Sequence, residues 1–159
     1  MKKLIYFLII ITFTNISFSA GTSSNSKDSS NYTKAYNLIK SAKKYEKKGK
    51  TEKALKRYSK AQKLLIESNK KKPLQADTLN YLGFTTRKLG DYKKGEEFYL
   101  QGLQIDPNHK GINEYLGELY VATDRINLAK ERLEVLKSCS CEEYEDLKEI
   151  INGTKKSKY

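Results

Sequence analysis

The chain has 159 residues, of which 31 are Lys or Arg and 19 are Asp or Glu, and its formal net charge is +12. This length allows one domain with a modest hydrophobic core. The chain has one His and two Cys, and no glycine loop of the kind that binds phosphate. Its residues therefore do not form a catalytic triad, a nucleotide site or a zinc helix motif. We therefore expect a non-catalytic protein that needs no metal and no cofactor.

Residues 1–19 have the pattern of a signal peptide. Two lysines precede an apolar run over residues 4–13, and small residues two positions apart follow it. Cleavage after Ser19 is favoured over cleavage after Ala20, which would place bulky Phe18 three positions before the cut. The apolar run is shorter than the roughly 20 residues of a bilayer span, so export with cleavage is favoured over an uncleaved membrane anchor. No transmembrane anchor is then expected in the mature chain.

Residues 20–31 are mostly Ser, Thr, Asn and Gly, which predicts a disordered spacer. Two helices are expected after it, over residues 32–48 and 51–69, separated by Gly49. The apolar stripe of the second helix is Ala54, Tyr58, Ala61 and Leu65. Residues 34–72 hold fifteen Lys or Arg and three acidic residues, a local net charge of +12. We expect a solvent-facing basic patch off the stripe, made of Lys53, Lys56, Arg57, Lys60 and Lys63.

The middle of the chain predicts two more helices, over residues 76–89 and 92–105, joined by Gly90 and Asp91. Asp91 is placed to accept a hydrogen bond from the first free N–H groups of the second helix. The residues at inward-facing spacing are Leu79, Leu82, Gly83 and Thr86, then Gly95, Tyr99, Gly102, Leu103 and Ile105.

Residues 110–123 and 126–138 repeat this plan, and a closing helix over residues 141–152 precedes a flexible tail, residues 153–159. Ser140 and Glu143 have the spacing of a capping box for the closing helix. His109 is expected to be exposed at a helix start.

The two cysteines, Cys139 and Cys141, stand between the last repeat and the closing helix. In an oxidising compartment a structural disulfide between them is expected. Free thiols and an intermolecular bridge are the alternatives, and a thiol-redox role would need exchange-active sulfur atoms.

The helix pairs recur with a regular period. Gly49, Gly90 and Asp124 stand at the turns, 41 and 34 residues apart, and the small residues 54, 95 and 129 keep the same two spacings. A helix-turn-helix period of 34 residues is the signature of the tetratricopeptide repeat (TPR). The middle pair resembles this family at Leu82, Gly83, Gly95, Tyr99, Gly102 and Pro107.

The resemblance implies an all-α fold, a right-handed α-solenoid of three helix-turn-helix repeats with a C-terminal capping helix. The repeats would span residues 35–75, 76–109 and 110–138, the capping helix 141–152 and the whole domain 32–152. The chain is also similar to small exported proteobacterial repeat proteins with a Cys pair near the end. That similarity implies the periplasm or cell envelope of a Gram-negative bacterium.

In this family the first helix of each repeat lines a groove for a protein or peptide. The resemblance therefore implies groove residues at Asn80, Phe84, Arg87, Lys88, Glu114 and Glu118. The alternative is that these side chains are only the solvated face of amphipathic helices. The carboxylate-clamp subclass needs a Lys/Asn pair where this chain has Ile39 and Lys43, so that subclass is not expected.

The function that these residues and the resemblance imply is a non-catalytic protein- or peptide-binding scaffold. A structural or membrane-surface role through the basic first repeat, on an anionic envelope surface, is the alternative. The basic charge also suits nucleic acid, but export and the lack of a base-reading motif argue against it.

Overall fold

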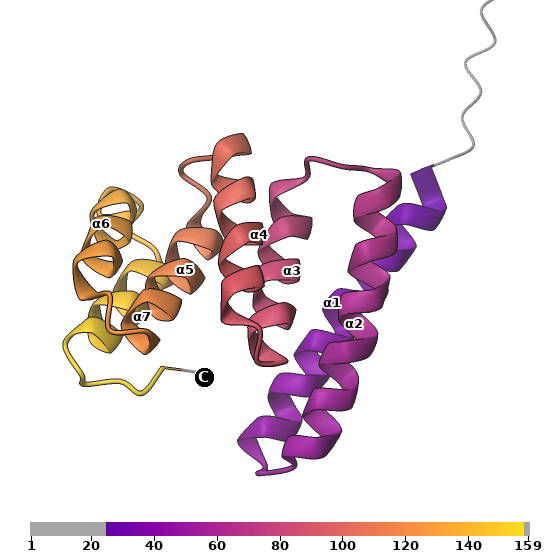
Figure 1. Cartoon of the computed structure of the whole chain (residues 1–159), viewed down its shortest axis with the longest axis horizontal. Coiled ribbons are helices and arrows are strands. Elements are labelled where there is room, and N and C mark those ends of the chain that lie inside the picture. Colours follow the sequence, from indigo (N-terminus) through magenta and orange to yellow (C-terminus); the bar gives the residue numbers. More distant parts are fainter. Residues whose placement is uncertain (1–24, 158–159) are drawn as a thin grey trace, which may run out of the picture.

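The computed structural model of the chain describes residues 25–157. The expected signal peptide, the cleavage site and the first part of the spacer lie outside the described residues. Within them, the regular structure is seven helices, shown in Figure 1. They are α1 (Asn25–Lys47), α2 (Thr51–Lys71), α3 (Ala76–Lys88), α4 (Tyr92–Ile105), α5 (Lys110–Ala122), α6 (Ile126–Leu136) and α7 (Glu142–Ile151).

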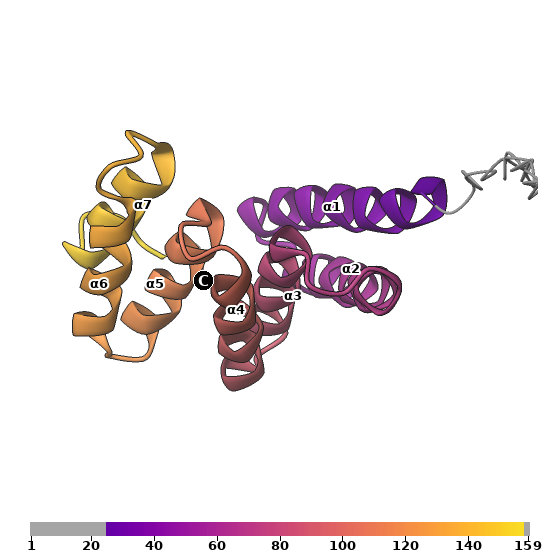
Figure 2. The ribbon, with the colours of Figure 1, turned by 90° about the horizontal axis from the view of Figure 1, so that it is seen from above.

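The helices form three hairpins, α1–α2, α3–α4 and α5–α6, which stack side by side, and α7 packs on α5 and α6. Figure 2 shows α1 and α7 at opposite ends of the stack, with α3 and α5 between them. This arrangement confirms the expected all-α helical repeat with a closing helix. None of the described helices is long and apolar enough to cross a membrane.

Small and aromatic residues at helical spacing hold the hairpins together. The expected stripe of α2 is fully buried, with Ala54, Tyr58, Ala61 and Leu65 each 0% exposed. Tyr99 of α4 is also fully buried and belongs to a second core cluster with Ile112 and Leu116 of α5. Each hairpin therefore shares its apolar face with the next, which is how a repeat that cannot bury its core alone becomes stable.

The turn inside each hairpin contains one residue in the left-handed backbone conformation, as the residues there suggest. Gly49 and Gly90 have φ of +68° and +98°, and Asp124 takes the equivalent position in the third hairpin with φ +58°. Asp is among the few residues besides Gly that adopt this left-handed region at low cost. Asp91 caps α4, because its Oδ1 accepts a hydrogen bond from the N–H of Lys94 at 2.9 Å.

The start of one helix and the burial of one side chain differ from the sequence-based expectation. α1 begins at Asn25, inside the segment expected to be a disordered spacer. Residues 25–31 contain no Pro or Gly that would interrupt a helix. Once the helix exists from Tyr32 onward, each residue added at its N-terminal end gains one backbone hydrogen bond. Ile105 was expected to be inward but is 39% exposed. At 100° per residue it lies roughly 90° from the buried side of α4.

The entry into α7 also differs. Its N-cap residue is Cys141, which makes no side-chain cap hydrogen bond, so the expected capping box of Ser140 and Glu143 does not form. Ser140 instead has φ +45°, and the Cα atoms of Cys139 and Cys141 are only 5.2 Å apart. With this bend, Cys141 rather than Ser140 occupies the N-cap position of α7.

Candidate functional site

The first helices of the hairpins, α1, α3 and α5, share one surface, which we call the inner surface. Aromatic contacts join them across it. The ring centroids of Tyr36 and Tyr81 are 5.6 Å apart, and those of Phe84 and Tyr115 are 5.1 Å apart. Lys43 of α1 donates from Nζ to the Tyr115 hydroxyl at 3.1 Å and lies over the Phe84 ring. A layer of tyrosines and one lysine therefore covers the middle of the inner surface.

A cleft of about 430 Å³ opens at one end of this layer, near the N-terminal ends of α3 and α5. Its lining includes four carboxylates against one lysine, Lys110, so its formal charge is negative. The residues that line it are Asp77, Asn80, Tyr81, Asp106, Asn108, His109, Lys110, Gly111, Glu114, Tyr115 and Glu143. Because side chains of α3, α5 and α7 all contribute, the cleft depends on the stacking of the repeats.

Asn80 is the most informative residue of the cleft. It is 5% exposed, and its Oδ1 is buried without a hydrogen-bond partner among the described residues. Gly111 gives its amide room, because a Cβ at position 111 would lie 2.8 Å from Asn80 Nδ2. An amide oxygen that is buried without a donor costs free energy unless a bound group supplies one.

His109 is not exposed as expected, since only 15% of its side chain is accessible. It is the N-cap residue of α5, where its Nδ1 accepts a hydrogen bond from the N–H of Ile112. Its Nε2 then carries the proton and donates to Asp77 Oδ1 at 3.1 Å. His109 therefore connects the second repeat to the third and forms one wall of the cleft.

The two tyrosines of the cleft remain protonated at physiological pH. Burial, with smaller contributions from Tyr36 and Asp77, raises the pKa of Tyr81 to about 12. Burial, followed by the charge of Glu114, raises the pKa of Tyr115 well above its usual value of 10. Both hydroxyls are therefore neutral hydrogen-bonding groups rather than anions.

Three of the expected groove residues lie beneath the inner surface rather than on it. Phe84, Arg87 and Glu118 are 1%, 2% and 0% exposed. Arg87 donates from Nη1 to the Tyr115 carbonyl at 2.8 Å, and its Nη2 lies 3.3 Å from Glu118 Oε2. Buried in this way, the three side chains offer little surface to a ligand, and the ion pair joins α3 to α5.

The other expected groove residues have different positions. Glu114 is 6% exposed and lines the cleft beside Asn80. Lys88 forms an ion pair with Glu46 and lies over the ring of Tyr58, so it connects α3 to the first repeat. The structure thus brings Asn80 and Glu114 together in the cleft and places Lys88 elsewhere.

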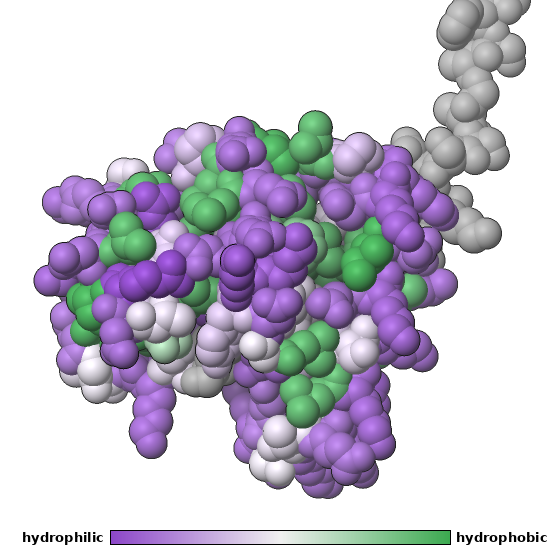
Figure 3. Space-filling view, in the orientation of Figure 1, coloured by the Kyte–Doolittle hydropathy of each residue, from purple (hydrophilic) through white to green (hydrophobic). Residues whose placement is uncertain are grey.

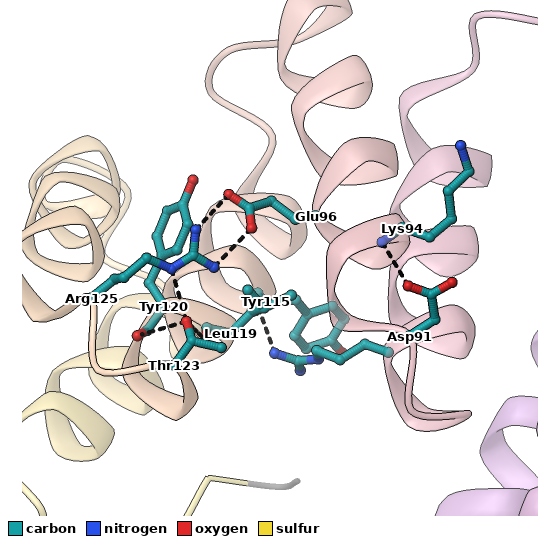
Figure 4. A network of polar contacts seen from close by, with 9 residues as sticks. Asp91, Lys94, Glu96, Tyr115, Leu119, Tyr120, Thr123 and Arg125 are labelled. Atoms are coloured by element: carbon teal, nitrogen blue, oxygen red, sulfur yellow. Dashed lines mark hydrogen bonds and ion pairs between the residues drawn. The ribbon is translucent and has the colours of Figure 1, made fainter.

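A second ion pair joins neighbouring repeats near the solvent. Arg125, in the turn between α5 and α6, donates to both oxygens of Glu96 on α4 at 2.8 Å, as Figure 4 shows. The Arg125 side chain is 37% exposed. Its guanidinium also lies 4.5 Å from the centroid of the Tyr120 ring. This pair is the surface counterpart of the buried Arg87–Glu118 pair.

Several residues that line the cleft were missed by sequence reasoning, among them Tyr81, Tyr115, Asp106 and Glu143. Tyr81 and Tyr115 had a detectable signal, because they stand 34 residues apart and each follows a groove residue, Asn80 or Glu114. Asp106 lies in a loop and Glu143 on the closing helix, so no repeat pattern places them at the cleft.

The basic patch lies on the first repeat, which is the outermost hairpin of the stack in the described part of the chain. Two adjoining depressions of about 460 and 280 Å³ run along α1 and α2, and we call them together the basic groove. Both include Leu38, Arg57 and Lys60. The remaining lining residues are Lys34, Asn37, Tyr45, Lys53, Lys56 and Leu64. Figure 3, which looks onto α2 and α4, shows a mostly hydrophilic face with separate hydrophobic patches.

The cysteines lie close together, with Cα atoms 5.2 Å apart and sulfur atoms within bonding distance. In the part of the chain that the structure describes, no three His, Cys, Asp or Glu side chains gather in a way that could hold a metal ion.

Comparisons with known proteins bear on the fold. No protein-family model and no curated protein matches the chain. Among solved structures, the first TPR of Spaghetti (RPAP3), bound to HSP90 peptide SRMEEVD, matches with a TM-score of 0.50 and 18% identity, over 77% of this chain and 94% of that one. The Arabidopsis OM64 TPR domain matches with a TM-score of 0.49 and 13% identity, over 79% of this chain and 99% of that one.

The match to Spaghetti covers nearly all of that domain, and it agrees with the stacked hairpins and their 34-residue period. At 18% identity it shows the fold alone. The chain therefore has the tetratricopeptide repeat fold, built here as three helix-turn-helix repeats and a closing helix.

Proposed function

We propose that the protein is a non-catalytic scaffold that binds an extended, basic segment of a protein or peptide in the cleft. The observation that carries this proposal is Asn80, which lines a cleft of about 430 Å³ and whose buried Oδ1 has no hydrogen-bond donor among the described residues. A backbone N–H of an extended peptide supplies such a donor. The hydroxyls of Tyr81 and Tyr115 add further hydrogen-bonding positions on the same wall.

The charge of the cleft determines the class of ligand. Asp77, Asp106, Glu114 and Glu143 surround it, and Lys110 is its one lysine. Lys or Arg side chains of a ligand would therefore be attracted and acidic side chains repelled. The Spaghetti repeat was solved with the acidic peptide SRMEEVD. This chain has buried Ile39 where the carboxylate-clamp subclass has a polar residue, so we expect the opposite ligand charge.

The test uses labelled seven-residue peptides that differ in net charge, with SRMEEVD as the acidic member, titrated against the full chain by fluorescence anisotropy. We expect affinity to rise with positive charge. Asn80→Ala is expected to weaken binding of the basic peptides about tenfold, because the ligand loses its acceptor. Asn127→Ala, at an exposed position on α6, serves as the matched control and is expected to bind like wild type. Equal binding by the two variants, or preference for SRMEEVD, would reject the proposal.

A second candidate function rests on the basic groove, whose apolar floor of Leu38 and Leu64 is bordered by cations. We propose that it attaches the protein to anionic surfaces of the envelope. Vesicles with anionic phosphatidylglycerol should bind the full chain at low salt and release it as the ionic strength rises.

Reversing two charges of the basic groove, Lys53→Glu with Lys60→Glu, should weaken vesicle binding at least tenfold, at about 1 kcal/mol per cation removed. Lys93→Glu with Lys130→Glu changes the net charge equally at exposed positions on α4 and α6. If both double variants lose affinity to the same extent, binding depends on net charge alone and the basic groove has no specific role.

We also propose that the mature protein is exported to the periplasm or cell envelope, with Cys139 and Cys141 joined in a disulfide. The proximity of the two sulfur atoms supports the bond, and the N-terminal pattern supports export. The intact mass of protein from an envelope fraction should correspond to a chain that begins at Ala20 and should rise by two hydrogen atoms on reduction. A mass that includes residues 1–19 would contradict export with cleavage.

A further inference from the structure

Two layers of polar side chains join α3 and α5, one buried and one at the cleft. The buried layer is the pair of Arg87 and Glu118. Asn80 stands seven residues before Arg87 on α3, and Glu114 stands four residues before Glu118 on α5. At helical spacing each lies on the same side of its helix as the member of the buried pair. Because Asn80 and Glu114 both line the cleft, the cleft continues the polar contact toward the N-terminal ends of the two helices.

In the buried layer the chain supplies its own cation. Arg87 donates from Nη1 to the carbonyl oxygen of Tyr115 at 2.8 Å, and its Nη2 lies 3.3 Å from Glu118 Oε2. One guanidinium thus serves an amide oxygen and a carboxylate together, because its N–H groups form a planar fork. The layer at the cleft has the same two kinds of acceptor, the amide oxygen of Asn80 and the carboxylate of Glu114. Residues 76–86 of α3, however, include no Lys or Arg that could supply the fork.

A second arginine of the chain shows what else a guanidinium uses. Arg125 donates to both oxygens of Glu96 at 2.8 Å, and its guanidinium lies 4.5 Å from the centroid of the Tyr120 ring (Figure 4). A guanidinium bonds to a carboxylate in its own plane and stacks on an aromatic ring through its face. The cleft brings the same two groups together, since Tyr81 and Tyr115 line it beside its carboxylates.

Burial in the cleft favours a guanidinium over an ammonium group. Asn80 and Glu114 are 5% and 6% exposed, so a cation that contacts them must lose most of its water there. A guanidinium is more weakly hydrated than an ammonium group, and its desolvation therefore costs less. Asn80 also points to a ligand by itself, because its Oδ1 is buried with no hydrogen-bond donor among the described residues. Its amide lies beside Gly111, another lining residue, where a Cβ would come within 2.8 Å of Nδ2.

We propose that the cleft is an arginine subsite, in which a guanidinium of the bound segment donates to Asn80 Oδ1, pairs with the Glu114 carboxylate and lies against Tyr81 and Tyr115. The amide oxygen has two lone pairs, so it accepts from the guanidinium and from a backbone N–H of the segment. A lysine supplies the charge but neither the fork nor the flat face. This inference rests on the proposed function, because it names the side chain that the basic segment must carry.

Three labelled seven-residue peptides test the inference on the full chain by fluorescence anisotropy. They share the same Gly and Ser residues and differ at three positions, which carry arginine, lysine or citrulline, the neutral isostere of arginine. The arginine peptide should bind at least tenfold more tightly than the lysine peptide, although the two net charges are equal. The citrulline peptide should bind most weakly, because it keeps the shape without the charge. Equal affinity of the arginine and lysine peptides would overturn the inference.

Glu114→Gln tests the ion pair of the subsite, because Gln keeps the length of the side chain and an acceptor oxygen but removes the charge. The affinity for the arginine peptide should fall about tenfold while that for the citrulline peptide stays the same. Glu131→Gln, at an exposed position on α6, is the matched control and should bind like wild type. Circular dichroism checks that both variants are folded. Wild-type affinity of folded Glu114→Gln for the arginine peptide would overturn the inference, and the peptide series on wild type decides it if this variant does not fold.

A blocked arginine, Nα-acetyl-arginine amide, separates a subsite for a peptide from a site for small guanidinium compounds. It should displace the arginine peptide, but only with an affinity at least tenfold below that of the peptide, because it lacks the neighbouring residues. If the blocked arginine binds as tightly as the peptide, the cleft takes free guanidinium compounds and the inference of an arginine within a segment is overturned.

The inference and the proposed function fail in distinguishable ways. Equal affinity of the arginine and lysine peptides, both weakened by Asn80→Ala, would reject the arginine subsite and leave a cleft that binds basic segments. Equal affinity of the citrulline peptide and the two basic peptides would reject the proposed function itself, since the cleft would then not select for positive charge.

Discussion

Replacing Arg87 by Ala is expected to lower the free energy of unfolding by about 3–5 kcal/mol, because it removes the guanidinium that pairs with the buried Glu118 carboxylate. The side chains of Arg87 and Glu118 are 1% and 0% exposed, so water cannot replace the lost partner. The substitution also removes the hydrogen bond from Arg87 to the Tyr115 carbonyl. Urea unfolding followed by circular dichroism measures the change.

The control is Arg125→Ala, which breaks the pair with Glu96. That pair is partly exposed, and solvent screening limits its expected contribution to about 1 kcal/mol or less. A double variant, Arg87→Met with Glu118→Leu, should recover most of the stability lost in Arg87→Ala, because it removes both charges together. If Arg87→Ala and Arg125→Ala cost the same, water must reach the Arg87–Glu118 pair in solution, and the pair does not stabilise the protein as a buried one.

This expectation also changes how the inner surface should be tested. The repeat resemblance places Arg87 among the groove residues, and a loss of partner binding in Arg87→Ala would support that reading. Since the Arg87 side chain is buried, a loss of partner binding would also follow from weaker packing of α3 against α5. Asn80 and Glu114 line the cleft directly, so they are the better residues for a binding test.

Much of the fold could be predicted because it follows from local pattern. The stripe of α2 gives the buried side of a helix from spacing alone, and every residue of that stripe is buried. Gly49 and Gly90 mark turns because the left-handed backbone conformation suits Gly. Three such hairpins with a recurring period leave one way to bury their faces, which is to stack.

Which side chains of the inner surface are exposed and which are buried could not be predicted. Helical spacing gives the direction of a side chain but not what lies above it. Arg87 and Glu118 point to the side of Asn80 and Glu114, yet they are covered, and their pairing joins residues 31 positions apart. His109 is mostly covered for the same reason, since its partner Asp77 belongs to the previous repeat. Contacts between repeats decided these positions, and a single sequence does not show them.

Replacing Gly83 by Ala is expected to destabilise the protein by about 1–3 kcal/mol through overpacking, although Ala favours helix over Gly by about 1 kcal/mol. An added Cβ would lie 2.5 and 2.6 Å from Cε1 and Cδ1 of Tyr99. Tyr99 is fully buried, and its rigid ring can leave this contact only by moving as a whole. The close approach of α3 and α4 therefore depends on a residue without a side chain at position 83.

Gly102→Ala is the matched comparison, in the partner helix of the same hairpin. There the added Cβ would meet Cδ1 of Ile112, the far end of a flexible side chain, and Leu79 Cβ at an ordinary 3.5 Å. A rotamer change of Ile112 relieves the contact, so the net effect should stay within about 1 kcal/mol. Urea unfolding of both variants measures the difference. Equal stabilities would mean that Tyr99 can move, and that the packing of α3 on α4 does not require Gly83.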